Sequence, residues 1–214
     1  ILMGIYLEVE DDVLTLVALD GFRLARRRGK LLASAGKVSA VVSGHYFIEA
    51  GKILGDDDAP VTLALSKTHL LRAKGFTVII RLLEGEYIKY RQLLPPSYAI
   101  STRVSRGELA DCIDRASLMA REGKNNLLRF SIRQDKLSIT SNSEMGDVYE
   151  EMDVETTGSD IDIAFNVRYI TDAVKSIDEE QFLIKLNSNI SPCVLVPTEG
   201  EDFLYLVLPV RTAG

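Results

Sequence analysis

Apolar and polar residues alternate along much of the chain, which predicts β-strands. Phe130 and Ile132, then Leu137 and Ile139, point their apolar side chains to one face with polar residues between them. The polar stretch 133–136 separates the two runs and predicts a hairpin turn. This pattern is typical of antiparallel sheets with one face buried.

Two segments change to the spacing of amphipathic helices. The first covers about 105–121, where Ser105 and Glu108 form a capping box. Its apolar face comprises Leu109, Cys112, Ile113, Ala116 and Met119. The second begins after Asn166, a good N-cap, and its stripe comprises Val167, Ile170, Val174 and Ile177.

The chain contains an internal repeat with an offset of 123 positions. D-V-L-T-L from Asp12 matches D-K-L-S-I from Asp135, and the helical segment from Val41 matches that from Ala164. In the first copy, Ser43 is the expected cap and Phe47 and Leu54 the expected stripe. We therefore predict an α+β protein of two repeated domains, residues 1–97 and 98–214, divided near the prolines at 95 and 96. By symmetry the first copy should have a helix that matches 105–121, but its place lies before residue 1. We therefore expect the chain to begin partway through a domain of a longer protein.

Composition narrows the class of protein. Apolar residues make up 46% of 214 residues, enough for a packed core, and no apolar run is long enough for a membrane span. The net charge of −6 disfavours a generic basic nucleic-acid binder. No secretory leader is recognisable, so Cys112 and Cys193 are expected to be buried, reduced thiols of a cytoplasmic protein.

The sequence offers little catalytic chemistry. His45 and His69 lack a motif context, and residues 56–58, all aspartates, are expected to form a solvated loop. We therefore expect no enzyme activity, no metal and no cofactor. The alternative is an enzyme with a site between the repeats, for which Asp20, His45 and Tyr169 are the candidates.

Four motifs in order resemble the bacterial sliding clamp family, the beta subunit of DNA polymerase III. They are A-L-D-G-F-R-L-A (18–25), E-G-E-Y-I-K-Y-R-Q-L-L-P (84–95), F-N-V-R-Y-I-T-D-A-V (165–174) and V-L-P-V-R (207–211). The resemblance implies a middle and a C-terminal clamp domain, each with antiparallel sheets outside and helices on one face. It also implies a head-to-tail dimeric ring that encircles duplex DNA, and no catalysis.

The resemblance further implies a pocket between the two domains that takes short peptides ending in a Leu-Phe-like pair. Partners would be the replicative polymerase catalytic subunit, the clamp loader, translesion polymerases and mismatch repair proteins. Its residues by this resemblance are Leu2, Gly21, Phe22, Arg23, Leu24, Ile88, Gln92, Leu93, Asn166, Tyr169, Ile190, Leu206, Val207, Leu208, Pro209, Val210 and Arg211.

DNA contact and ring closure are also implied. By resemblance the DNA-facing cations are Lys52, Arg106, Arg115, Arg168 and Lys175, and binding should be weak, salt-sensitive and independent of sequence. Met119 and Ala120 would lie at the dimer interface of the full-length homodimer. An alternative function is a protein–protein adaptor that never meets DNA. No membrane partner is expected in either case.

Overall fold

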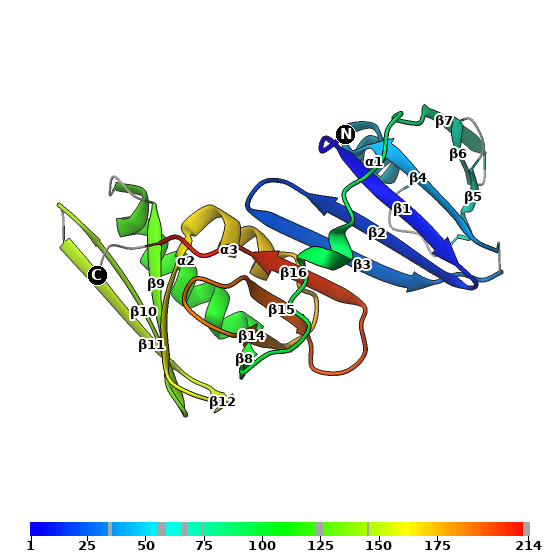
Figure 1. Cartoon of the computed structure of the whole chain (residues 1–214). Helices are drawn as coiled ribbons and strands as arrows, with labels where there is room; N and C mark the ends of the chain where they lie inside the picture. Colours follow the sequence, from blue (N-terminus) through cyan, green and yellow to red (C-terminus); the bar gives the residue numbers. More distant parts are fainter. Residues whose placement is uncertain are drawn as a thin grey trace. The chain divides into compact units, whose positions relative to one another are not determined.

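The computed structural model describes residues 1–33, 36–54, 59–65, 68–73, 75–122, 126–144 and 146–211, with backbone only for 68–73, 121 and 122. The aspartate run at 56–58 and the side chain of His69 lie outside the described residues. The chain forms two compact units (Figure 1). The first holds Ile1–Asp20 and Arg26–Lys89, and the second holds Gly21–Ala25 and Tyr90–Gly214.

The first unit places a helix beside two antiparallel sheets. One sheet has the strand order β3 (Arg23–Lys30), β2 (Val13–Leu19), β1 (Gly4–Glu10) and β4 (Val38–Ser43). Helix α1 (Gly44–Leu54) follows β4. The other sheet contains β5 (Thr62–Leu65), β6 (Thr68–Ala73) and β7 (Phe76–Arg81).

The second unit repeats this plan and adds to it. Its four-stranded sheet has the order β11 (Gly146–Asp153), β10 (Lys136–Ser143), β9 (Leu127–Ile132) and β13 (Ile161–Asn166). The other sheet runs β12 (Glu155–Thr157), β8 (Ile100–Ser105), β14 (Gln181–Leu186), β15 (Cys193–Pro197) and β16 (Phe203–Val207). Helices α2 (Arg106–Glu122) and α3 (Val167–Lys175) pack on the sheets, and the short 3-10 helix η1 (Tyr90–Leu93) opens the unit.

The repeat predicted from the sequence is confirmed by the topology. Strand β2 begins at Val13 and β10 at Lys136, and α1 begins at Gly44 and α3 at Val167, both 123 positions apart. The order β3-β2-β1-β4 matches β11-β10-β9-β13 strand for strand. The predicted α+β class with two repeated domains is therefore correct.

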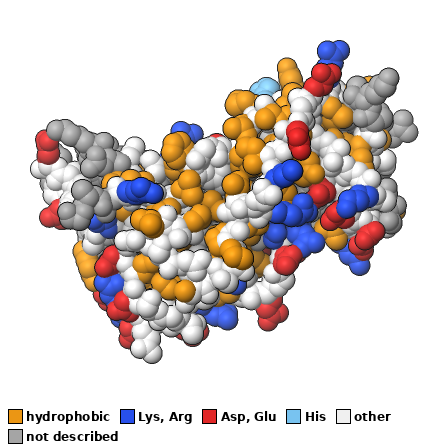
Figure 2. Space-filling model, viewed as in Figure 1, with side chains coloured by type: hydrophobic (Ala, Val, Ile, Leu, Met, Phe, Trp, Pro, Cys, Tyr) orange, Lys and Arg blue, Asp and Glu red, His pale blue; other side chains and the backbone are white. Residues whose placement is uncertain are grey.

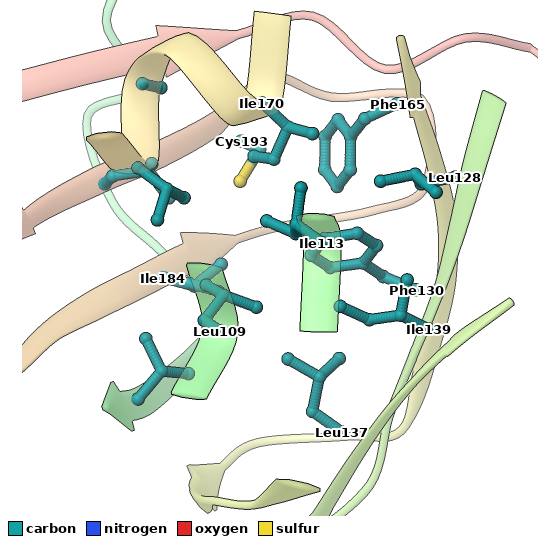
Figure 3. Packing of buried hydrophobic residues seen from close by; sticks show 14 of the residues in the cluster. Leu109, Ile113, Leu128, Phe130, Leu137, Ile139, Phe165, Ile170, Ile184 and Cys193 are labelled. Atoms are coloured by element: carbon teal, nitrogen blue, oxygen red, sulfur yellow. The ribbon is translucent and has the colours of Figure 1, made fainter. Parts of the chain in front are cut away.

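The core of the second unit joins both sheets to both helices (Figure 3). Leu109 and Ile113 of α2 point toward Phe130 of β9, and all three are 1% exposed or less. The rings of Phe130 and Phe165 meet edge to face with centroids 5.3 Å apart. This packing determines which faces of α2 and α3 are exposed to solvent, because rotating either helix would expose its apolar stripe.

The predicted helix caps of the second unit are present. The Ser105 hydroxyl accepts a hydrogen bond from the backbone N–H of Glu108 at 3.4 Å, and the Asn166 side chain accepts one from that of Arg168 at 3.0 Å. The predicted apolar faces are buried, except that Met119 is only half-buried. Ile177 is buried although α3 ends before it, since the backbone N–H of Ile177 still bonds to Val174.

The predicted stripe of the first copy is correct only in part. Ala50 is the buried residue of α1 and packs with Ile80, whereas Phe47 and Leu54 are half-buried. The predicted hairpin at 133–136 is confirmed by a bond from the Arg133 N–H to the carbonyl oxygen of Lys136 at 2.8 Å.

Both cysteines are buried and free, as the sequence predicts. Burial raises the pKa of the Cys112 and Cys193 thiols. Across the described helices, none combines the length and the apolar character that a membrane crossing needs.

Candidate functional site

An aromatic platform, formed by Phe22, Arg23 and Tyr169, lies on the surface of the second unit. The rings of Phe22 and Tyr169 are stacked, with centroids 5.6 Å apart and planes 20° apart. The Arg23 guanidinium lies 4.8 Å from the centroid of the Tyr169 ring, within cation–π range. Arg23 also donates to the Asp172 carboxylate at 2.6 Å. Phe22 is nevertheless 56% exposed, so the platform presents an apolar ring to solvent.

Helix α3 fixes the position of this platform. Asn166 caps the helix, and Val167, Ile170 and Val174 anchor it in the core. Tyr169 and Asp172 are three positions apart and therefore share a flank of the helix at the edge of the core, where Tyr169 is half-buried against the core and Asp172 is exposed. The apolar stripe of α3 thus determines where the Tyr169 ring and the Asp172 carboxylate emerge.

The C-terminal segment runs beside the platform and is tied at two points. The backbone N–H of Leu208 donates to the carbonyl oxygen of Phe22 at 2.9 Å. The backbone N–H of Val210 donates to the carbonyl oxygen of Ala164, in β13, at 2.8 Å. These bonds hold the 208–210 segment next to Phe22, with Leu208 36% exposed and Pro209 and Val210 half-buried.

The structure divides the other predicted pocket residues into groups. Leu24, Leu206 and Val207 are buried, so they pack beneath the surface and contribute little exposed area themselves. The predicted pocket residues with larger exposed areas in the second unit are Gly21, Gln92, Leu93, Ile190 and Arg211. Leu2 and Ile88 belong to the first unit. Figure 2 shows apolar side chains at the surface of the second unit among charged and uncharged ones.

Most of the predicted DNA-facing cations have a carboxylate partner. Arg115 pairs with Glu150 at 2.6 Å, Arg168 with Asp172 at 3.9 Å, and Lys175 with Asp114 at 3.0 Å. In the first unit, Lys52 pairs with Glu49 at 2.7 Å. Arg106 differs, since it is half-buried and its Nε has no hydrogen-bond partner in the described part of the chain.

The helix surface of the second unit is therefore balanced in charge. Among the described side chains of α2 and α3, four are cationic and four are anionic. They are Arg106, Arg115, Arg168 and Lys175 against Glu108, Asp111, Asp114 and Asp172. The hydrogen bond from Arg115 lowers the pKa of Glu150, which keeps that carboxylate charged. A balanced surface gives a phosphate backbone little net attraction.

The two residues predicted at a dimer interface differ in exposure. Met119 is half-buried, and the Ser143 hydroxyl lies 3.7 Å from its sulfur atom. Ala120 is 2% exposed and packs in the core, so its side chain adds little to the outer surface.

The three candidates for an enzyme site belong to different units. Tyr169 takes part in the aromatic platform of the second unit, whereas Asp20 and His45 belong to the first unit. The centroid of the His45 ring lies 5.2 Å from that of the Tyr46 ring. Among the side chains that the structure describes, no group of three or more His, Cys, Asp or Glu residues could hold a metal ion.

Sequence reasoning found Phe22, Arg23 and Tyr169 but missed their anionic partner. Neither Asp172 nor Glu150 is among the site residues that the sequence predicts. The spacing within α3 does show that Asp172 shares a flank with Tyr169. No signal in a single sequence could have joined Arg23 to a residue 149 positions away.

Comparison with known proteins identifies the family. Residues 1–89 match the central domain, and residues 91–211 the C-terminal domain, of the DNA polymerase III beta subunit. The chain is 33% identical to the beta sliding clamp of Staphylococcus aureus strain Mu50, over 99% of this chain and 57% of the relative.

Solved structures agree. The DNA polymerase sliding clamp of Bacillus subtilis superimposes with a TM-score of 0.94 at 32% identity, over 99% of this chain and 57% of that one. A putative DNA polymerase III beta subunit from Eubacterium rectale gives a TM-score of 0.93 at 33% identity, over 98% and 57%. The chain thus spans little more than half the length of these relatives. On both sequence and structure, it belongs to the DNA polymerase III beta subunit family.

Proposed function

We propose that this chain supplies the middle and C-terminal domains, residues 1–97 and 98–214, of a DNA sliding clamp. The observation that carries the proposal is the pair of clamp-type domains in family order, each built on the same strand order. Such a clamp would encircle duplex DNA as a head-to-tail homodimer, with Met119 near the interface. It would make or break no covalent bond and would act in the bacterial cytoplasm.

The aromatic platform is the proposed peptide-binding site of the second unit. A partner of the clamp, such as a polymerase, the clamp loader or a repair protein, would place the apolar end of a short peptide against Phe22 and Leu208. A partly exposed aromatic ring beside an apolar side chain suits a Leu-Phe anchor. Tethering by such a peptide raises the concentration of the partner at the DNA without any new chemistry.

Peptide binding is tested by fluorescence anisotropy with a labelled Gln-x-x-Leu-Phe peptide. The site variant is Leu208→Asp, which puts a charge beside Phe22 at a side chain that is 36% exposed. Leu24→Asp would be a poor choice, because Leu24 is 3% exposed and the change would unfold the strand. The matched control is Ile79→Asp, an exposed apolar residue of the first unit.

We expect saturable binding by the wild type and by Ile79→Asp, and at least tenfold weaker binding by Leu208→Asp. Absence of binding by a folded wild type would refute the peptide site. Equal loss in both variants would show that the effect of Leu208→Asp is not local.

DNA contact is proposed to be weak, because the helix surface is balanced in charge. The test compares duplexes of two unrelated sequences at low and physiological salt, using the double variant Arg168→Glu, Lys175→Glu. Arg129→Glu is the control, since Arg129 is exposed on β9 between Leu128 and Phe130, which point into the core. We expect weak binding that ignores sequence, falls with salt and is lost only in the double variant. Equal DNA binding by the double variant would favour the adaptor hypothesis.

A further inference from the structure

We propose that Asn187 is a positioning residue of the peptide-binding site, because it ties together two segments that carry exposed apolar side chains. One segment, which we call the strap, comprises residues 90–99 and includes η1 and the green chain that leads from it to β8 (Figure 1). The other is the loop 187–192, which follows β14. The inference rests on the proposed function, and it assigns a role there to a residue outside the predicted set.

The Asn187 side chain extends the ladder between β14 and β8 beyond its last backbone pair, which joins Leu186 to Ile100. Its amide nitrogen donates a hydrogen bond to the carbonyl oxygen of Ser97 at 2.8 Å. Its amide oxygen accepts one from the backbone N–H of Ala99, also at 2.8 Å. A side-chain amide offers a donor and an acceptor, as a peptide group does, so it can serve as a backbone partner after β14 has ended. Without it, the Ala99 N–H keeps its bond to the Leu186 carbonyl oxygen at 3.1 Å, but the Ser97 carbonyl oxygen loses this donor.

Other contacts hold the two ends of the strap to the second unit. At its start, Tyr90 is 3% exposed. Near its end, the Lys185 ammonium lies 5.6 Å from the centroid of the Tyr98 ring, within cation–π range. A Cβ atom on Gly158 would overlap the carbonyl oxygen of Ala99, so the chain is closely packed there. Residues 91–93 are exposed, so the strap is anchored at both ends and open in the middle.

The connection from Asn187 to the exposed middle of the strap is short and stiff. Leu93 is 46% exposed and stands four positions before Ser97. Pro95 and Pro96 lie between them, and each proline ring fixes the backbone angle φ. Holding Ser97 in place therefore restrains the direction in which Leu93 points.

Asn187 also begins the loop that carries Ile190, whose side chain is 61% exposed. A hydrogen bond of 2.7 Å between the hydroxyl groups of Ser188 and Ser191 stabilises this loop. Asn187 thus connects the segment that presents Leu93 to the one that presents Ile190. A peptide that contacts both side chains finds them already ordered, so its binding costs less conformational entropy.

A double-mutant cycle separates positioning from a general effect on stability. The single variants are Asn187→Ala, which removes both hydrogen bonds, and Leu93→Ala, which removes most of the apolar side chain on the strap. The affinity of the labelled Gln-x-x-Leu-Phe peptide is measured by anisotropy for the wild type, both single variants and the double variant. A second cycle pairs Asn187→Ala with Leu208→Ala, since Leu208 follows β16 and is not part of the strap.

We expect Asn187→Ala to weaken peptide binding about three- to tenfold, the size of one net hydrogen bond. In the Leu93→Ala background the same change should weaken binding less than about twofold, because the side chain that Asn187 positions is gone. In the Leu208→Ala background it should keep its full effect. The control is Asn189→Ala, a change at an exposed asparagine of the same loop, which should bind like the wild type. A similar loss in Asn189→Ala would overturn the assignment to Asn187.

Hydrogen-exchange mass spectrometry tests the tie itself. Asn187→Ala should speed amide exchange in the strap, while β9 and β10 keep the protection they have in the wild type. Equal exchange of the strap in the wild type and in Asn187→Ala would overturn the tie between the strap and the loop.

The binding results distinguish this inference from the proposed function. Unchanged affinity in Asn187→Ala, despite faster exchange of the strap, would show that the tie does not position the site. Equal losses from Asn187→Ala in the wild-type and Leu93→Ala backgrounds would show that Asn187 does not act through the strap. In both cases the peptide site stands, whereas failure of a folded wild type to bind the peptide overturns the proposed function together with this inference.

Discussion

Arg23 and Asp172 are 149 positions apart in the sequence, yet the Arg23 guanidinium donates to the Asp172 carboxylate at 2.6 Å. Asp172 lies on α3, one helical turn after Tyr169, and Arg23 follows Phe22 directly. The ion pair therefore joins the segment that carries one ring of the platform to the helix that carries the other. The pair is thus a contact within the aromatic platform as well as a surface charge pair.

Removal of this ion pair should weaken peptide binding with little effect on stability. For Asp172→Asn we expect a two- to fivefold loss of affinity, because Arg23 and Phe22 become less ordered, and a loss of less than about 1 kcal/mol of stability, as is usual for exposed pairs. The measurements are peptide anisotropy and thermal unfolding.

The repeat supplies a control for this change. Glu49 is the counterpart of Asp172 in the first unit and pairs with Lys52 at 2.7 Å. Glu49→Gln removes a similar surface pair without touching the platform, so peptide affinity should not change. A loss of affinity in both variants would argue that overall charge, and not the Arg23–Asp172 contact, controls binding.

The N-cap of α3 should contribute both to stability and to the site. In Asn166→Ala the backbone N–H of Arg168 loses its partner, which is expected to cost about 1 kcal/mol. Asn166→Asp keeps an oxygen acceptor and should retain most of that stability. Urea unfolding followed by a probe in the second unit measures the difference, and equal destabilisation by both variants would show that the cap itself is not responsible.

The fold could be predicted from the sequence because its evidence is local and repeated. Alternation between Phe130 and Ile139 gave the hairpin, and the stripe from Val167 to Val174 gave α3 with its cap. The 123-residue offset then transferred both to the first copy. The transfer was less accurate for α1, where Ala50 and not Phe47 is the buried residue, because side-chain burial depends on neighbours that differ between copies.

The platform was predictable only in its parts. The residues Phe22 and Tyr169 came from motifs, but their stacking and the Arg23–Asp172 pair join segments that no spacing rule connects. The same holds for the helix surface, where the resemblance names Arg115 and Lys175 but not their carboxylate partners, Glu150 of β11 and Asp114 of α2. Ion pairs between residues on different helices and strands depend on how these elements pack, so the sequence alone does not predict them.

The core of the second unit should depend strongly on α2. Ile113 is 1% exposed and packs between the sheets, so Ile113→Ala is expected to cost about 2–5 kcal/mol. Leu118 lies on the same helix with 61% exposure, so Leu118→Ala should change stability by no more than about 0.5 kcal/mol.

Two compact units need not unfold together, so the measurement must report on the second unit alone. Hydrogen-exchange mass spectrometry of β9 and β10, which this core joins, meets that need. Faster exchange in those strands for Ile113→Ala, with Leu118→Ala like the wild type, is the expected result. Similar protection in both variants would contradict the assignment of Ile113 to the core.

Acid should release the Arg115–Glu150 ion pair. The hydrogen bond from Arg115 lowers the pKa of Glu150 below its ordinary value of 4.5. A lowered carboxyl pKa stabilises the folded state at pH values above 4.5, and this contribution is lost as the pH falls through the folded-state pKa.

Arg115→Gln removes the cause of the shift. The urea midpoint, followed by a probe in the second unit, should therefore be higher for the wild type than for Arg115→Gln at neutral pH, and the difference should shrink in acid. Arg103→Gln is the control, since its partner Glu155 is 84% exposed and the pair is looser, at 3.7 Å. A difference between wild type and Arg115→Gln that stays the same from neutral pH into acid would show that the pKa of Glu150 is not lowered by this contact.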